Sequence, residues 1–318
     1  VEKCGKDLKL VYTPVHGSGF VPVTTILKKL GINTTVVEEQ TTKDTEFSTV
    51  KVPNPEFKET LSMGIALANK INADVVFGTD PDSDRVGIVV RDKTGSYVPV
   101  SGNRTGALLL HYMLTMGEQK GLLPEHPALV KTIVTSSLPQ IIAEDHGAIC
   151  RNTFTGFKNM AEEVGRLEQE GKYRYVLAYE ESYGYMMGDY VRDKDAVVAS
   201  MLICEMTAYY AALAHSLGGK VTAYWLDGYA VCKDGKVTGF MNDGIHGVCQ
   251  VIFIIMRCDA DVILVEVGRI GVFGFADDHV AVAQNGAAVG VGVVADLMAP
   301  GVDLLDQLRI FVHPDAYQ

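Results

Sequence analysis

The sequence DVVFGTDPDSDR, residues 74–85, joins a short apolar run to a loop that carries three aspartates. The apolar run is typical of a buried strand, and the loop begins at its carboxyl end, where α/β folds bind ligands. Asp80, Asp82 and Asp84 occupy alternate positions, so their carboxylates can converge on one hard divalent cation. Arg85 follows them with a forked guanidinium that suits a phosphate. The stretch therefore predicts a metal-binding loop beside a phosphate-binding arginine.

Two other interpretations of this loop are a calcium-binding EF-hand and a solvated acidic turn. An EF-hand needs glycine at its sixth position and glutamate at its twelfth, but counting from Asp80 places Arg85 and Arg91 there. A solvated turn does not need three aspartates, because their mutual repulsion is unfavourable unless a cation lies among them. The metal-binding interpretation is therefore favoured.

Around this loop, the apolar periodicity alternates between that of strands and that of helices. In chain order we expect a strand at 8–12, a helix opened by Pro22 and ended by Gly31, a strand at 34–37, a helix near 56–71, and a hairpin of strands 86–90 and 97–100. The pattern recurs as a helix near 105–116, a strand at 131–135, a helix at 139–145, a strand at 148–152, a helix near 159–168, a strand at 173–178 and a long helix at 196–214 that Asp195 caps. Each of the two series contains a strand that is followed by an acidic loop. The first acidic loop is Asp80–Arg85 and the second is Tyr179–Tyr185. The repetition predicts two similar α/β domains with mixed sheets.

The residues after about 215 differ in composition from the rest. From Val221 onward there are eleven aspartates but one glutamate, with two lysines and three arginines. Apolar runs at 251–256 and 262–267 indicate strands, and a helical period is recognisable only at 302–311. The expected organisation is a metal-binding α/β domain at 1–100, a second α/β domain at 101–214, and an unassigned Gly/Val-rich α+β tail at 215–318.

Composition and charge exclude several classes of protein. Hydrophobic residues make up 47% and charged residues 21% of the 318, a globular balance that argues against disordered and fibrous proteins. The net charge is −11, and no Lys/Arg cluster offers the basic face with which proteins bind nucleic acid. No apolar run reaches the ~20 residues of a membrane span. Six cysteines without a CxxC pair fit reduced thiols, so we expect a cytoplasmic protein with neither membrane nor nucleic-acid partners.

Several weaker motifs have both a functional and a structural interpretation. HGSG, residues 16–19, lies between a strand and a helix, where backbone N–H groups suit an anion, but such turns are often purely structural. Glu180 and Ser182 would suit the hydroxyl groups of a sugar, or belong to a surface turn. Lys194 lies near the start of a helix and suits a phosphate, or belongs to a solvated charge run. The Gly-Phe-Lys segment that ends at Lys158 is too short to be informative alone.

Together and in this order, five motifs resemble those of the α-D-phosphohexomutase family, whose members include phosphoglucomutases and phosphomannomutases. The motifs are TPVHGSG at 13–19, GTDPDSDR at 78–85, TGFK at 155–158, EESYGY at 180–185 and RDKDAV at 192–197. The sequences EESYGY and VRDKDAV are most similar to those of the branch that contains bacterial phosphoglucomutases and phosphopentomutase-like enzymes. The resemblance assigns residues 1 to about 100 to the family's second, metal-binding domain, and about 101–214 to its third, sugar-recognition domain.

The resemblance also implies roles for individual residues. The metal ligands that it implies are Asp80, Asp82 and Asp84, which would hold Mg²⁺. The catalytic residues that it implies are Arg85, near the transferring phosphoryl group, and Lys194, for proton transfer or phosphate contact. The substrate-binding residues that it implies are Lys158, which helps to seat the substrate, and Glu180 and Ser182, which bind sugar hydroxyls. A hexose phosphate, on the order of 10 Å long, has to bridge the two acidic loops at contact distance, so we expect both loops to open on one side across a gap of about that size.

The function that the resemblance implies is the interconversion of a sugar 1-phosphate with its 6-phosphate or 5-phosphate. The reaction of the family proceeds through a phosphoserine and a bisphosphate intermediate, with a sugar bisphosphate as activator. The family's serine domain and the Arg-Pro-Ser-Gly-Thr loop of its fourth domain have no counterpart here, no Ser-His-Asn motif occurs, and Val1 is not a Met. We therefore expect a part of a phosphohexomutase that is inactive alone.

Two alternatives stay open. One is a non-catalytic module that binds a metal or a sugar phosphate. The other is a DxD-type phosphatase, with Asp80 as the nucleophile and Asp82 as the acid. The sequence does not distinguish hexose from pentose substrates, and it leaves the oligomeric state open.

Overall fold

The computed structural model describes residues 8–92 and 94–216, and the backbone of six strands between 222 and 266. The chain divides into two compact units, Val1–Thr222 and Ala223–Gln318. The first unit contains two α/β domains, each built on its own sheet.

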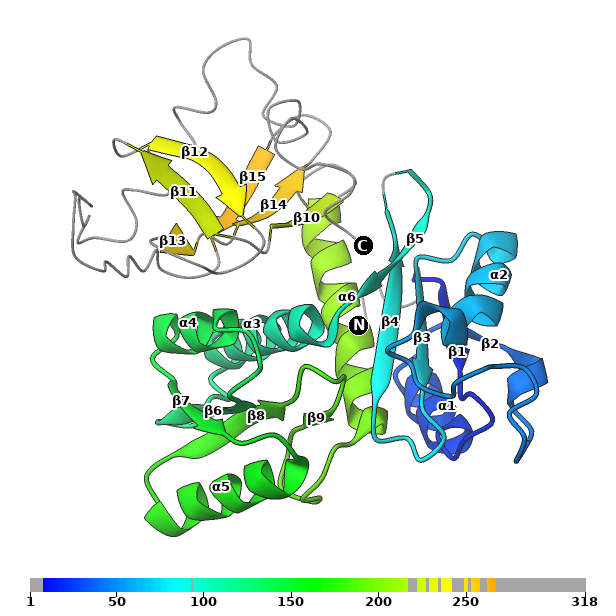
Figure 1. The fold of residues 1–318 in the computed structure, drawn as a ribbon, viewed down its shortest axis with the longest axis horizontal. Coiled ribbons are helices and arrows are strands. Elements are labelled where there is room, and N and C mark those ends of the chain that lie inside the picture. The colour runs from blue at the N-terminus through cyan, green and yellow to red at the C-terminus, as the bar shows by residue number, and fades with distance from the viewer. Residues whose placement is uncertain are drawn as a thin grey trace. The chain divides into compact units, whose positions relative to one another are not determined.

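The first α/β domain has a five-stranded sheet with the strand order β2-β1-β3-β4-β5 (Figure 1). Its strands are β1 (Leu10–Thr13), β2 (Thr34–Val36), β3 (Val75–Thr79), β4 (Val86–Arg91) and β5 (Tyr97–Val100). Its helices are α1 (Phe20–Lys29), α2 (Ser62–Ile71) and the short 3₁₀ helices η1 (Glu38–Gln40) and η2 (Lys58–Leu61). β1, β2 and β3 are parallel, whereas β4 and β5 form an antiparallel hairpin. Buried Val11, Val76 and Val89 of the sheet pack with Leu61 and Ala68, which attaches η2 and α2 to the sheet.

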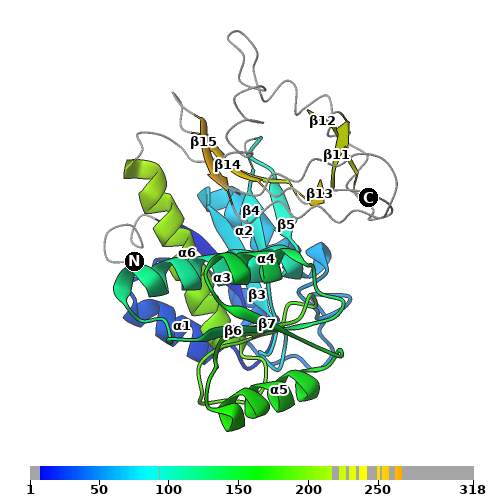
Figure 2. The ribbon, with the colours of Figure 1, turned by 90° about the vertical axis from the view of Figure 1, so that its left-hand side faces the viewer.

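The second α/β domain has a four-stranded sheet with the order β7-β6-β8-β9. Its strands are β6 (Pro127–Thr132), β7 (Ile149–Thr153), β8 (Arg174–Tyr179) and β9 (Tyr185–Met186), and its helices are α3 (Gly102–Lys120), α4 (Leu138–Asp145) and α5 (Phe157–Glu170). Helices α3 and α4 cover one face of the sheet and α5 covers the other (Figure 1 and Figure 2). Under α5, Val130 and Ala178 pack against Met160, Val164 and Leu167.

The two sheets repeat one order of strands. In each, the first parallel strand lies between the second and the third, and an antiparallel strand follows beside the third. β3 and β8 are the equivalent third strands, and each ends in an acidic loop. The prediction of two similar mixed-sheet α/β domains is therefore confirmed.

One predicted strand is wrong in position. The strand expected at 131–135 is β6, and it ends at Thr132. Ile133 and Val134 extend the apolar run in the sequence, but they are 57% and 54% exposed in the turn that leads to α4. The prediction was wrong because two apolar residues of an exposed turn continue the apolar pattern of the strand in the sequence. β9 was not expected, because two residues are too few to show an alternating pattern.

Helix α6 (Ala196–Ser216) runs between the two α/β domains (Figure 1). It contacts α1 and β4 of the first domain, and α3 and β9 of the second. Asp195 caps its first turn as expected, since its Oδ1 accepts the N–H groups of Val197 at 2.8 Å and Val198 at 3.2 Å. One helix thus packs against both domains directly after the segment that contains Lys194.

Beyond α6 the structure describes strand backbone. The strands are β10 (Thr222–Leu226), β11 (Tyr229–Lys233), β12 (Lys236–Met241), β13 (Cys249–Gln250), β14 (Phe253–Arg257) and β15 (Val262–Glu266). β14 and β15 pair antiparallel, which agrees with the strands expected at 251–256 and 262–267. The helix expected at 302–311 lies outside the described residues.

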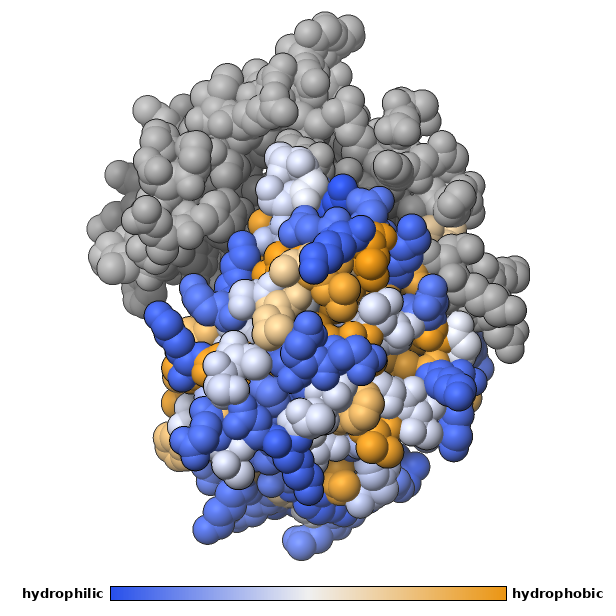
Figure 3. All heavy atoms as spheres, turned by 90° about the vertical axis from the view of Figure 1, so that its right-hand side faces the viewer, coloured by the Kyte–Doolittle hydropathy of each residue, from blue (hydrophilic) through white to orange (hydrophobic). Residues whose placement is uncertain are grey.

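Within the described parts of the chain, no helix combines the length and the apolar character needed to cross a bilayer. On the face of the molecule drawn in Figure 3, hydrophilic side chains are interspersed with small groups of apolar ones.

Candidate functional site

The carboxylate of Asp80 organises the acidic loop between β3 and β4. Asp80 is 1% exposed, and its Oδ1 accepts the backbone N–H groups of Asp84 at 3.0 Å and Arg85 at 2.9 Å. Its Oδ2 accepts Nε–H of Arg85 at 2.8 Å. Ser83 has a positive φ of 61°, which lets the loop turn back so that these amides reach Asp80. The loop is therefore held in shape by the first of its own aspartates.

The three aspartates predicted as metal ligands lie together. One carboxylate oxygen each from Asp80, Asp82 and Asp84 lies within 4.8 Å of the others. Asp80 is buried, Asp82 is exposed and Asp84 is half-buried, so the cluster is open to solvent on one side. An all-oxygen, carboxylate-rich set of this kind fits a hard cation such as Mg²⁺.

Burial affects the acidity of this cluster. It raises the pKa of Asp80 to about 6, although the hydrogen bonds from the amide and guanidinium of Arg85 act to lower it. An ionised Asp80 therefore depends on positive charge close by.

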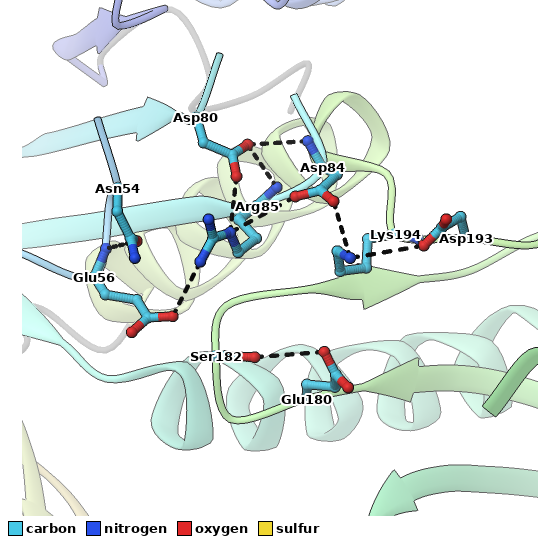
Figure 4. A network of polar contacts seen from close by, with 9 residues as sticks. All are labelled: Asn54, Glu56, Asp80, Asp84, Arg85, Glu180, Ser182, Asp193 and Lys194. Carbon is cyan, nitrogen blue, oxygen red and sulfur yellow. Dashed lines mark hydrogen bonds and ion pairs between the residues drawn. The ribbon is translucent and has the colours of Figure 1, made fainter. Parts of the chain in front are cut away.

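Arg85 supplies part of that charge, in contact with three carboxylates (Figure 4). Its Nε lies 2.8 Å from Asp80 and 3.7 Å from Asp84, and its Nη1 lies 3.3 Å from Oε1 of Glu56. Glu56 was not predicted as a site residue. It belongs to a polar segment 29 residues before Arg85, and no spacing or periodicity in the sequence connects the two. Asn54 holds it there, since its Oδ1 accepts the Glu56 N–H at 2.9 Å.

Lys194 reaches the acidic loop from the other α/β domain. Its Nζ lies 2.9 Å from Oδ2 of Asp84 (Figure 4). The same Nζ lies 5.0 Å from the centre of the Phe157 ring. A cation from the segment before α6 thus contacts a predicted metal ligand. The resemblance implies proton transfer or phosphate contact for Lys194, and the structure adds this ion pair.

The second acidic loop uses its two adjacent glutamates differently. Oε1 of Glu180 accepts the Gly156 N–H at 2.8 Å, and its Oε2 accepts Oγ–H of Ser182 at 3.4 Å. Glu181 instead accepts the hydroxyls of Thr132 and Thr135 at 3.0 and 3.2 Å, within the second domain. Glu180 therefore connects the loop to the TGFK segment, while Glu181 anchors the loop to the end of β6.

Lys158 lies at the start of α5, two residues beyond the Gly156 amide that Glu180 accepts. Its side chain is exposed, so it is available to a ligand in solution. The structure thus brings the TGFK segment to the second acidic loop, and brings Lys194 to the first.

The two acidic loops meet along their backbones. The Val86 N–H donates to the carbonyl of Tyr183 at 3.2 Å, Arg85 and Gly184 form an antiparallel bridge, and the Ala196 N–H donates to the carbonyl of Ser83 at 3.1 Å. Tyr183, like Ser83, has a positive φ. The loops therefore lie on one side, as expected, but they touch there instead of being separated along their length by a gap. The reason is that the residues that open β4 extend beside the second loop.

The HGSG segment differs from its expected role. The amides of His16, Gly17 and Ser18 donate within the protein, to the carbonyls of Gln40, Pro14 and Pro81 at 2.9, 2.8 and 2.8 Å. The ring nitrogens of His16 contact the Thr42 carbonyl at 2.8 Å and the Thr49 hydroxyl at 2.7 Å. These amides do not point outward to an anion, so the anion-binding interpretation of this turn is not supported.

Two family models match the chain, one in each of the two α/β domains. Residues 2–95 match the family model of phosphoglucomutase/phosphomannomutase alpha/beta/alpha domain II, and residues 101–224 match that of domain III. A phosphoglucomutase of Staphylococcus haemolyticus is 37% identical over 203 residues, and one of Staphylococcus epidermidis is 39% identical over 203 residues. Each alignment covers 64% of this chain and 36% of the relative, so the chain spans about a third of the length of these relatives.

Solved structures show the same fold. A phosphoglucomutase/phosphomannomutase family protein of Burkholderia thailandensis aligns with a TM-score of 0.52 and 18% identity, over 93% of this chain and 62% of that one. A candidate phosphomannomutase of Thermus thermophilus aligns with a TM-score of 0.50 and 20% identity, over 83% of this chain and 58% of that one.

Proposed function

This chain belongs to the phosphoglucomutase/phosphomannomutase family, and from that membership we propose that it takes part in moving a phosphoryl group between positions of a sugar phosphate. The observation that carries the proposal is the direct contact of the two acidic loops, through the Val86–Tyr183 hydrogen bond and the Arg85–Gly184 bridge. A phosphoryl group held by the first loop would then lie within reach of a sugar held by the second.

Asp80, Asp82 and Asp84 are the residues that would hold Mg²⁺. When bound, the cation would supply positive charge to the oxygens of the transferring phosphoryl group. The chain's own cations would act beside it. Contacts of Nε and Nη1 with carboxylates orient the Arg85 guanidinium, whose remaining N–H groups would face the phosphoryl oxygens. Lys194 would contribute a second positive charge next to Asp84.

The second loop would recognise the sugar. Glu180 and Ser182, already hydrogen-bonded to each other, would exchange hydrogen bonds with its hydroxyl groups. Lys158, exposed at the start of α5, would contact the phosphate that is not being transferred. We propose the phosphoserine route with a sugar bisphosphate as intermediate and activator, and a cytoplasmic location.

A phosphatase that uses Asp80 as its nucleophile fits these contacts less well. Both oxygens of Asp80 accept hydrogen bonds from Arg85, and the side chain is 1% exposed. A covalent aspartyl-phosphate at Asp80 would be the finding that revives this alternative.

The metal assignment is tested by titrating the protein with Mn²⁺ and following the free ion by electron paramagnetic resonance. We expect weak saturable binding that Asp82→Ala abolishes. Because Asp82 is exposed, its removal should leave the free energy of unfolding within about 0.5 kcal/mol of the original protein. Asp189→Ala, at another exposed aspartate, is the matched control and should bind normally. Undiminished binding by Asp82→Ala would contradict the assignment.

Turnover is a separate prediction. The 318 residues contain no Ser-His-Asn motif, so we expect this polypeptide alone not to convert glucose 1-phosphate in the presence of glucose 1,6-bisphosphate. Conversion above background that persists through purification, and that Asp82→Ala removes, would show that the chain has a phosphoryl acceptor of its own.

A further inference from the structure

The loop between β1 and α1 is strained and lies against the acidic loop after β3. Val15 and His16 have φ values of 45° and 60°, in the left-handed region that a β-branched residue such as Val15 rarely adopts. Val15 is fully buried and His16 is 7% exposed. Backbone strain of this kind costs on the order of 1–3 kcal/mol for each residue and persists only where surrounding contacts enforce it.

Hydrogen bonds connect the strained loop to residues 40–49. The His16 ring contacts the Thr42 carbonyl and the Thr49 hydroxyl, and the Gln40 amide donates to the same hydroxyl at 2.9 Å. The hydroxyl of Thr13 donates to Oε1 of the fully buried Gln40. Residues 13–16 are therefore hydrogen-bonded to the last residue of η1 and to the segment that follows it.

Ser18 and Gly17 of the loop between β1 and α1 contact Pro81, which lies between the predicted metal ligands Asp80 and Asp82. The carbonyl of Pro81 accepts both the N–H of Ser18 at 2.8 Å and its Oγ–H at 3.2 Å. A Cβ atom at Gly17 would lie 2.4 Å from the Cα of Pro81 and 2.5 Å from its carbonyl oxygen. Backbone atoms cannot yield to such an overlap by a change of rotamer, so any side chain at position 17 would displace the acidic loop.

Gly19 makes a similar approach to the base of the acidic loop. A Cβ atom there would lie within 2.7 Å of the hydroxyl oxygens of Thr79, Ser83 and Tyr12. Tyr12 and Thr79 are hydrogen-bonded to each other at 2.9 Å and both are buried. The acidic loop therefore packs closely against two glycines of the loop between β1 and α1: Gly17 at Pro81, and Gly19 at Thr79 and Ser83.

We propose that Gly17, Ser18 and Gly19 are positioning residues that set the direction of the metal-ligating aspartates. By fixing the Pro81 peptide, they determine how the Asp80 and Asp82 carboxylates lie relative to each other. This inference rests on the proposed metal site. It assigns to the HGSG segment a role in shaping that site.

The experiment measures the affinity for Mn²⁺, by electron paramagnetic resonance on the full chain, for Gly17→Ala and Gly19→Ala. Both should weaken binding by about 10-fold or more, as is typical when residues that orient metal ligands are lost. Gly165→Ala is the matched control, because a Cβ there meets nothing within 4 Å, and its affinity should equal that of the original protein. Ser18→Ala removes one of the two hydrogen bonds to Pro81 and should weaken binding by about threefold.

Urea unfolding of each variant separates positioning from simple loss of stability. A merely structural role would lower the unfolding midpoint and leave the Mn²⁺ affinity of the folded molecules unchanged, which would overturn the inference. If a glycine variant does not fold, Ser18→Ala, which introduces no overlap, decides the question, and normal binding by it would count against the inference. If the original protein itself does not bind Mn²⁺, it is the proposed metal site that fails.

Discussion

Arg85 is the residue on which the charges of the acidic loop converge. It donates to the buried Asp80 and to Glu56 through different nitrogen atoms of one planar group, and its side chain is 29% exposed. A lysine carries the same charge at a single point, and it cannot reproduce two contacts in different directions. The geometry of the guanidinium therefore matters here as much as its charge.

Arg85→Lys is expected to lower the free energy of unfolding by about 1–2 kcal/mol, because Asp80 would keep its charge but lose a directed, charge-assisted hydrogen bond. Urea unfolding monitored by circular dichroism measures this change. The control is Arg166→Lys, whose exposed guanidinium pairs with Glu162 and Glu163 on the same helix, and its effect on the free energy of unfolding should be much smaller. Equal effects of the two substitutions would show that the Arg85 contacts are as weak as surface pairs.

At the scale of secondary-structure elements, a histidine pair lies where α3, the end of α4 and α6 pack together. Nδ1 of His111 lies 2.6 Å from the hydroxyl of Tyr210, and the His111 ring lies edge-on to His146, 6.0 Å away. His146 in turn contacts Glu118 of α3 at 2.8 Å. Burial, and next the neighbouring His146, lower the pKa of His111 to about 4, against the opposite effects of Asp145 and Glu118.

This junction should make the fold sensitive to acid. His111 is neutral in the folded state above about pH 4, whereas in the unfolded chain it takes up a proton near pH 6.5. Lowering the pH through this window therefore favours unfolding, and the full effect is on the order of 3 kcal/mol. Urea unfolding of His111→Gln should show a smaller loss of stability between pH 7 and pH 4 than the original protein.

The control for this prediction is His126→Gln, at an exposed histidine outside the junction, which should keep the original pH dependence. If His111→Gln keeps it as well, the acid sensitivity has another origin.

At the scale of the whole first unit, the two α/β domains are joined where their acidic loops meet. The Val86–Tyr183 hydrogen bond, the Arg85–Gly184 bridge and the Lys194–Asp84 ion pair cross from one domain to the other, and α6 packs against both. Ordering the first loop should therefore also order the second, because the two share backbone hydrogen bonds.

Hydrogen–deuterium exchange tests this coupling. Addition of Mn²⁺ is expected to slow amide exchange in residues 180–186 as well as in 80–86. Lys194→Met keeps an unbranched side chain but removes the ammonium group, which lies over the Phe157 ring and pairs with Asp84, and it should reduce the effect on the second loop more than that on the first. Protection confined to residues 80–86 in the original protein would show that the domains respond independently.

The repeated α/β architecture and the triad of Asp80, Asp82 and Asp84 were both predictable from the order of the residues alone. Both depend on local order, because the periodicity of a strand or helix and the spacing of three aspartates in one loop are properties of neighbouring residues. The strand predicted at 131–135 shows the limit of that reasoning, since apolar character alone does not distinguish a buried strand from an exposed turn.

The distant residues that complete the site became apparent only from the folded arrangement of the chain. Glu56 lies 29 residues from Arg85, Ser18 lies 63 residues from Pro81, and Lys194 comes from another domain than Asp84. The HGSG turn has the sequence of an anion-binding loop, yet its amides are used by the carbonyls of Gln40, Pro14 and Pro81. Such pairings arise from the way strands and loops are brought side by side in the folded chain, and no local pattern encodes them, because contacts between remote segments depend on the packing of the elements that carry them.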